Sequence, residues 1–247
     1  MENKEIIFGR NPVLEYIRSL KTADAVLHVS NTAHGRIIDE IISAAKSKRI
    51  KIDFCGKDIL FKFEPSSRHQ GVVLELARTM LEASREITLR DFLAAVGAEK
   101  GVLVFLDQIT DPHNTGSIIR TTEALGGRGV ILTKDRSAGI TPAAAKASAG
   151  ATAHLPVYTV PNAATFLENA KEAGFWIIGT SDKGSVELSK LKELKPAVII
   201  IGSEGTGMRS LTEAKCDFVA GIPLKGNISS LNAAVAAGII LYEALKD

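Results

Sequence analysis

Residues 101–133, GVLVFLDQITDPHNTGSIIRTTEALGGRGVILT, contain the pattern that decides the fold. An apolar run, VLVFLD, is followed by a polar turn, a helical segment that ends in glycines, and a second apolar run, GVILT. Short apolar runs that alternate with helices are typical of parallel strands covered on both faces. This stretch therefore predicts a strand–helix–strand unit.

The same alternation continues along the rest of the chain. Further apolar runs are HLPVYTV, FWIIGT, AVIIIG and FVAGIPL, separated mainly by helical or loop segments. They predict an α/β domain over residues 101–247 with a mainly parallel sheet. Residues 1–80 contain shorter strand and helix signals and predict a small α/β domain of their own, and residues 81–100 are expected to form a connector.

Composition narrows the classes of protein that the chain can belong to. A hydrophobic content of 45% in 247 residues is enough for a substantial core, and a net charge of +2 is too small for a protein that coats nucleic acid. The basic cluster within residues 46–51 fits either a solvated helix face or an RNA-facing patch. Cys55 and Cys216 are too far apart in sequence for a disulfide scaffold or a zinc ribbon. No apolar run reaches membrane-spanning length, and we expect a cytoplasmic protein.

Three loops that follow predicted strands contain the candidate functional residues, because ligands of such sheets bind beyond the carboxyl ends of the strands. The first loop follows the strand ending at Leu106. Asn114 is expected to cap the next helix, and Arg120 is expected to point away from the apolar face that contains Ile118. Taken alone, this loop is more typical of an ordinary helix start with a surface arginine.

The second loop is GSEGTGM, residues 202–208. Its glycines allow a sharp turn and a close approach of the backbone to a ligand, and Glu204 is in the middle. The glycine spacing differs from that of the dinucleotide-binding fingerprint, and no suitably spaced acidic residue ends a following strand. The hypothesis that the chain is a nucleotide-dependent dehydrogenase is therefore supported by this loop alone.

The third loop is IPLKGNISSLN, residues 222–232, where Ile222 and Pro223 are expected to close a strand. Polar residues crowd the start of the helix that follows, whose remainder is almost entirely apolar. A helix of that composition is expected to be buried on most sides. Free amide groups at its start are able to hold polar atoms of a ligand.

Together, the segments 114–120, 202–208 and 222–232 resemble the signature loops of the SpoU/TrmH-type RNA 2'-O-ribose methyltransferases of the SPOUT superfamily. The segments GRNPVLEYI (9–17), RHQGVV (68–73) and TKDRSA (133–138) resemble the branch that methylates guanosine in 23S rRNA. The resemblance extends over nearly the whole chain.

This resemblance implies a C-terminal α/β-knot, a deep trefoil knot, preceded by a small RNA-binding domain. It implies S-adenosyl-L-methionine as the cofactor, no metal, RNA as the substrate and a homodimer with its sites near the subunit interface. A tRNA substrate, or a noncatalytic RNA-binding or ribosome-assembly role for the same fold, remains an alternative.

The family's site residues correspond to two sets of positions in this sequence. The catalytic set comprises Arg120, Asn114, Glu204, Ser229 and Asn232. The cofactor-binding set comprises Gly202, Ile222 and Leu231, with Thr180, Leu224 and Ser230 as weaker candidates.

Overall fold

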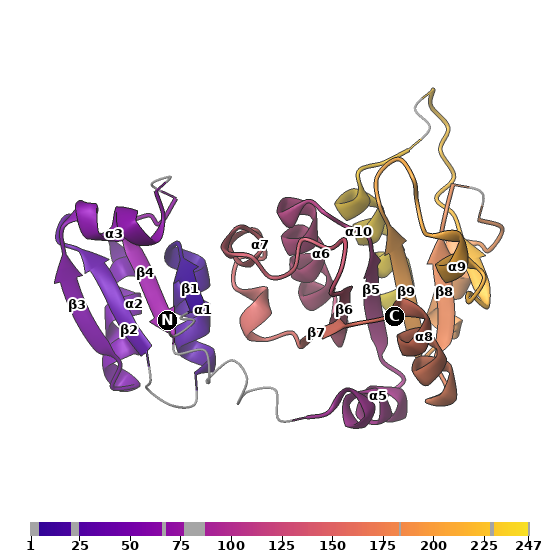
Figure 1. The fold of residues 1–247 in the computed structure, drawn as a ribbon, viewed down its shortest axis with the longest axis horizontal. Coiled ribbons are helices and arrows are strands. Elements are labelled where there is room, and N and C mark those ends of the chain that lie inside the picture. The colour runs from indigo at the N-terminus through magenta and orange to yellow at the C-terminus, as the bar shows by residue number, and fades with distance from the viewer. Residues whose placement is uncertain are drawn as a thin grey trace. The chain divides into compact units, whose positions relative to one another are not determined.

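A computed structural model describes residues 5–20, 25–65, 68–76, 87–182, 184–227 and 230–246. By its contacts the chain divides into two units (Figure 1). The first comprises Met1–Glu86 and Ser148–His154, and the second comprises Ile87–Ala147 and Leu155–Asp247. Within the described ranges, no helix is both long enough and apolar enough to cross a membrane.

The first unit contains a four-stranded mixed sheet in the order β1-β4-β2-β3. β2 and β3 are parallel, whereas β4 is antiparallel to both β1 and β2. One core cluster of this unit contains Phe8, Cys55, Leu60 and Val73. The elements are β1 (Glu5–Phe8), α1 (Arg10–Ser19), β2 (Ala25–Ser30), α2 (Arg36–Ser47), β3 (Lys51–Cys55), α3 (Lys57–Phe63) and β4 (Val72–Leu76), together with the short 3-10 helix Ala151–Ala153.

The second unit contains a six-stranded sheet in the order β10-β8-β9-β5-β6-β7, and all its strand pairs are parallel. The predicted α/β fold with a mainly parallel sheet is thus confirmed. The strands are β5 (Val102–Asp107), β6 (Gly129–Thr133), β7 (Val157–Val160), β8 (Trp176–Thr180), β9 (Ala197–Gly202) and β10 (Phe218–Ala220). The helices are α5 (Leu89–Ala98), α6 (Pro112–Ala124), α7 (Pro142–Ala147), α8 (Ala163–Glu172), α9 (Ser210–Glu213) and α10 (Ala233–Leu245), with a 3-10 helix at Leu188–Glu193.

One core cluster of this unit lies between the sheet and two helices, α5 and α8. Phe92 from α5 and Phe166 from α8 pack in one cluster with side chains of the central strands, including Phe105 and Ile200. α5 lies within the stretch expected to be a connector, and its apolar side belongs to this core. α6 and α10 pack against each other, and this contact brings two of the predicted signature loops together.

Two predicted boundaries near the site are wrong. Asn114 does not cap α6, because the helix starts at Pro112 and its N-cap is Asp111, whose side chain accepts the backbone N–H of His113. Proline at the first helical position has the φ angle of a helix, which fixes this earlier start. β10 ends at Ala220 rather than at Pro223. Proline has no N–H to donate to a strand ladder.

The prediction that the last helix is buried on most sides is also wrong for the single chain. Val235, Ile239 and Tyr242 on α10 have exposed fractions of 52%, 37% and 57%. Ala237, Ile240 and Leu241 of the same helix are buried. α10 therefore has one apolar face in the core and another open to solvent.

Candidate functional site

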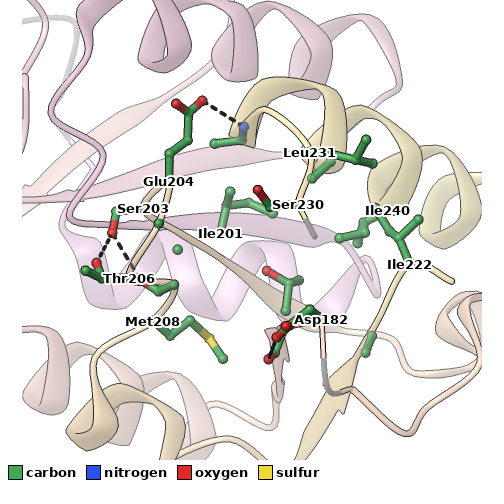
Figure 2. Close-up of a pocket in the computed structure, with 18 of the residues that line it drawn as sticks. Asp182, Ile201, Ser203, Glu204, Thr206, Met208, Ile222, Ser230, Leu231 and Ile240 are labelled. Atoms are coloured by element: carbon green, nitrogen blue, oxygen red, sulfur yellow. Dashed lines mark hydrogen bonds between the residues drawn. The ribbon is translucent and has the colours of Figure 1, made fainter. Parts of the chain in front are cut away.

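A cavity of about 500 Å³ lies at the carboxyl ends of β8 and β9, beside the start of α10. Its walls come from the segments 180–182, 201–208 and 230–240, together with residues around the end of β10. Figure 2 shows Ile222 and Leu231 on one side of the cavity and Met208 on the other. Three segments that are distant in sequence thus form one pocket.

The glycine-rich loop forms one wall of this cavity. Ser203 and Gly207 exchange two backbone hydrogen bonds of 3.0 Å, which close the loop into a tight hairpin. At Gly202 an added Cβ would lie 2.4 Å from the carbonyl carbon of Gly207 and 2.5 Å from the backbone nitrogen of Met208. Only glycine therefore lets the loop fold back onto the end of β9.

Glu204 joins the three loops through one carboxylate oxygen. Its Oε1 accepts hydrogen bonds from Asn114 Nδ2 at 3.0 Å, from Asn232 Nδ2, and from the backbone N–H of Ala233 at 3.1 Å. Asn232 Nδ2 also donates to Asn114 Oδ1 at 3.0 Å. Asn232 Oδ1 accepts the N–H groups of Ala234 and Val235, so Asn232 is also the N-cap of α10. We call Glu204, Asn114 and Asn232 the polar triad.

All the residues expected to bind the cofactor line this cavity. They are Gly202, Ile222, Leu231, Thr180, Leu224 and Ser230. Thr180 donates its hydroxyl to the carbonyl oxygen of Ile200 at 2.7 Å, which fixes this side chain between β8 and β9. The cavity combines apolar walls with hydroxyl groups and loop backbone, and its size is within the range of small-molecule sites.

The residues expected to be catalytic are only partly brought together. Glu204 lines the cavity, and Asn114 and Asn232 bind Glu204 directly. Arg120 is exposed on α6 and is not among the described residues that line the cavity. Ser229 lies outside the described residues.

Two features near the cavity were not predicted from the sequence. Asp107 at the end of β5 is completely buried and pairs with Arg209, which follows the glycine-rich loop. The only sequence signal for a buried Asp107 was its position as a charged residue at the end of an apolar run. Cys216 and Met208 both pack against the core cluster of this unit, and burial raises the pKa of the Cys216 thiol to about 11, with Glu213 and Asp217 adding to the increase. The thiol therefore stays protonated and is a poor nucleophile at neutral pH.

Metal binding has no candidate in the part of the chain that the structure describes, where no group of three or more His, Cys, Asp or Glu side chains is arranged to hold an ion. The cavity is instead lined by hydroxyls, carboxylates, backbone groups and apolar side chains. Such a lining fits an organic molecule with both polar and apolar parts.

Comparisons with known proteins agree with this geometry. The profile of the SpoU rRNA Methylase family matches residues 101–242, and the profile named RNA 2'-O ribose methyltransferase substrate binding matches residues 6–80. The putative TrmH family tRNA/rRNA methyltransferase YacO of Bacillus subtilis is 36% identical, over 99% of this chain and 96% of its own length. The 23S rRNA (guanosine-2'-O-)-methyltransferase RlmB of Nitrosomonas europaea is 32% identical, over 100% of this chain and 93% of its own length.

A solved structure extends the agreement to three dimensions. The SpoU methyltransferase AviRb from Streptomyces viridochromogenes, in complex with AdoMet, has a TM-score of 0.78 and 25% identity, over 98% of this chain and 89% of that chain. Both the sequence profiles and this structure extend across the two units described above. The chain belongs to the SpoU family of RNA methyltransferases.

Proposed function

We propose that this chain transfers a methyl group from S-adenosyl-L-methionine to a ribose 2'-hydroxyl in RNA, and that its target is a guanosine in 23S rRNA. The observation that carries the proposal is the single cavity lined by all six expected cofactor residues, with the polar triad at its edge. The relative RlmB, named for guanosine 2'-O-methylation of 23S rRNA, supports the target.

A tRNA target is the second candidate, because several relatives are named tRNA/rRNA methyltransferases. Methyl transfer to purified 23S rRNA and to tRNA, followed by mapping of the 2'-O-methyl positions, separates the two substrates. RNA with a 2'-deoxy nucleotide at the mapped position should accept no methyl group, since the acceptor oxygen is missing. Cofactor binding without transfer to any RNA would favour a noncatalytic role.

S-adenosyl-L-methionine would supply a methyl group made electrophilic by a sulfonium. The reaction requires the ribose oxygen, the methyl carbon and the sulfur to be nearly in line, so positioning by the protein supplies much of the rate enhancement. We assign Gly202, Ile222 and Leu231 to holding the cofactor, together with Thr180, Leu224 and Ser230. The expected trefoil knot would enclose this cavity.

We assign Arg120 to the RNA rather than to proton transfer. A guanidinium remains protonated at physiological pH, which makes it a poor general base. Its forked charge is suited to binding the phosphate beside the target ribose and to stabilising negative charge that develops on the 2'-oxygen. Glu204 uses Oε1 for its described contacts with the triad, and we assign Oε2 to accepting the hydroxyl proton or orienting Arg120.

The exposed position of Arg120 supports a homodimer in which each arginine serves the cavity of the other subunit. The apolar face of α10 formed by Val235, Ile239 and Tyr242 is exposed in the single chain, and α10 packs beside α6, which carries Arg120. An exposed apolar patch of this kind marks an interaction site. A second copy bound there would bury this face and lie next to Arg120.

The test uses two inactive variants. Arg120→Ala should abolish methyl transfer while the Kd for S-adenosyl-L-methionine stays within a few fold, and Glu204→Ala should also be inactive. If Arg120 acts across the interface, mixing the two after subunit exchange should restore about a quarter of wild-type activity, because half of the dimers gain one complete site. Near-normal turnover by Arg120→Ala would refute its assignment, and no recovery on mixing would place Arg120 in the site of its own subunit.

A further inference from the structure

Asp107 holds both ends of the glycine-rich loop. Through the backbone, Asp107 is the register partner of Gly202, the last residue of β9. Through its side chain, it binds Arg209, the first residue after the loop 203–208. Oδ2 accepts the Arg209 backbone N–H at 2.9 Å, Oδ1 accepts Nε at 2.7 Å, and Nη2 lies 2.6 Å from Oδ1.

The segment between these two attachment points is the wall of the cavity. Residues 203–208 all line it, and Glu204 of the polar triad belongs to the same segment. Neither Asp107 nor Arg209 is among the described lining residues. The pair therefore acts on the cavity only through the loop that it fastens.

The two partners differ in burial, which makes their roles separable. The Asp107 side chain is 0% exposed, whereas the Arg209 side chain is 36% exposed. A buried charge that loses its partner is strongly destabilising, whereas the partly exposed Arg209 guanidinium keeps some contact with water even though its Nη2 is buried. Removing the arginine should therefore harm stability more than neutralising the aspartate does.

We propose that Asp107 and Arg209 are positioning residues for the cofactor cavity, which they keep in its binding shape by fastening the loop 203–208 at both ends. This inference rests on the proposed cofactor site. If the released loop adopts the binding shape about one-tenth of the time, the apparent Kd for the cofactor rises about tenfold, because affinity is reduced by the fraction of competent protein. Because neither residue lines the cavity, the pair is expected to act on cofactor binding without touching the cofactor.

The experiment compares Asp107→Asn, Arg209→Leu, Arg209→Lys and the double variant Asp107→Asn/Arg209→Leu. Thr122→Val is the matched control, since Thr122 is a buried residue of α6 whose hydroxyl bonds only to the Ile118 carbonyl among the described contacts. Three quantities are measured: the Tm, the Kd for S-adenosyl-L-methionine by calorimetry, and hydrogen exchange of the loop amides without cofactor.

The double variant separates positioning from stability. Its Tm should exceed that of Arg209→Leu, because the buried carboxylate has been neutralised, while its Kd stays about tenfold above the wild-type value. The amides of Ser203 and Gly207 should exchange faster than in wild type. Arg209→Lys keeps the charge but not the fork, and should recover Tm more than affinity. Thr122→Val should lower Tm and leave both Kd and loop exchange unchanged.

Two results would overturn the inference. One is a double variant whose Kd returns to the wild-type value together with its Tm, since the pair would then act only through stability. The other is hydrogen exchange of the loop amides in Asp107→Asn at the same rate as in the wild type. This measurement is made without cofactor. Failure of the wild-type protein to bind S-adenosyl-L-methionine would instead refute the proposed function, and faster loop exchange in the variants would still support the fastening of the loop.

Discussion

Replacing Glu204 with glutamine or alanine should weaken the polar triad by different amounts. Glu204 Oε1 accepts three hydrogen bonds. A hydrogen bond to a charged group contributes about 1.5–3 kcal/mol and one between neutral groups about 0.5–1.5 kcal/mol, so glutamine should lose about 1 kcal/mol per bond before screening. Glu204 is exposed, and solvent screening reduces the total loss to about 1–1.5 kcal/mol for glutamine and about 2–3 kcal/mol for alanine.

Urea denaturation measures these losses as changes in the free energy of unfolding. Glu172→Gln on α8 is the control for loss of an exposed carboxylate, and it should change the free energy by less than about 0.5 kcal/mol. A double-mutant cycle of Glu204→Ala with Asn232→Ala should give a coupling energy of about 1 kcal/mol, because the two side chains share hydrogen bonds. Coupling below about 0.3 kcal/mol would refute the reasoning, since it would make the contacts energetically independent.

Three further predictions concern the loop, the buried thiol and the exposed helix face. Gly202→Ala should destabilise the protein by about 1–3 kcal/mol and weaken cofactor binding, because the new Cβ meets backbone atoms at 2.4 and 2.5 Å. In urea denaturation and cofactor titration, Gly226→Ala should be nearly neutral, as a Cβ there has no neighbour within 4 Å among the described atoms. The Cys216 thiol ionises near 9.0 when unfolded but at a pKa of about 11 when folded, so the stability that it contributes is present below pH 9 and lost between pH 9 and 11. Unfolding curves of Cys216→Ala should lack this part of the decline, and an identical decline would contradict the assignment. Tyr242→Glu, which charges the exposed face of α10, should convert the proposed dimer to a monomer in light scattering, and a monomeric wild type would exclude that interface.

The strands of the second unit were predictable because most of them are buried on both faces. β5 and β6 are buried along their whole length and appear in the sequence as unbroken apolar runs. An unbroken apolar run indicates that a strand is buried, but it does not indicate which strands lie beside it in the sheet. The sequence therefore predicted parallel strands, while the placement of β10 beside β8, and of β5 between β9 and β6, depends on contacts between distant segments.

The candidate site was predictable to a similar extent. The residues expected to bind the cofactor lie at the carboxyl ends of parallel strands or in the segments after them, so their place at one edge of the sheet was predictable from the strand pattern and the family resemblance. The resemblance placed Asn114 in one set with Glu204, but the local pattern wrongly made Asn114 the cap of α6, because the start of that helix depends on Pro112. The pairing of Asp107 with Arg209 joins residues 102 positions apart and leaves no local pattern to detect.

The separation of the polar triad along the chain has a consequence for biosynthesis. Asn114 and Glu204 are 90 positions apart, and Asn232 is 118 positions from Asn114. A ribosome translating this message completes all the strands of the second sheet before it reaches Asn232. The nascent polypeptide therefore has no complete polar triad until the start of α10 has been synthesised, and premature termination before that point yields a product with all its sheet strands but without the triad.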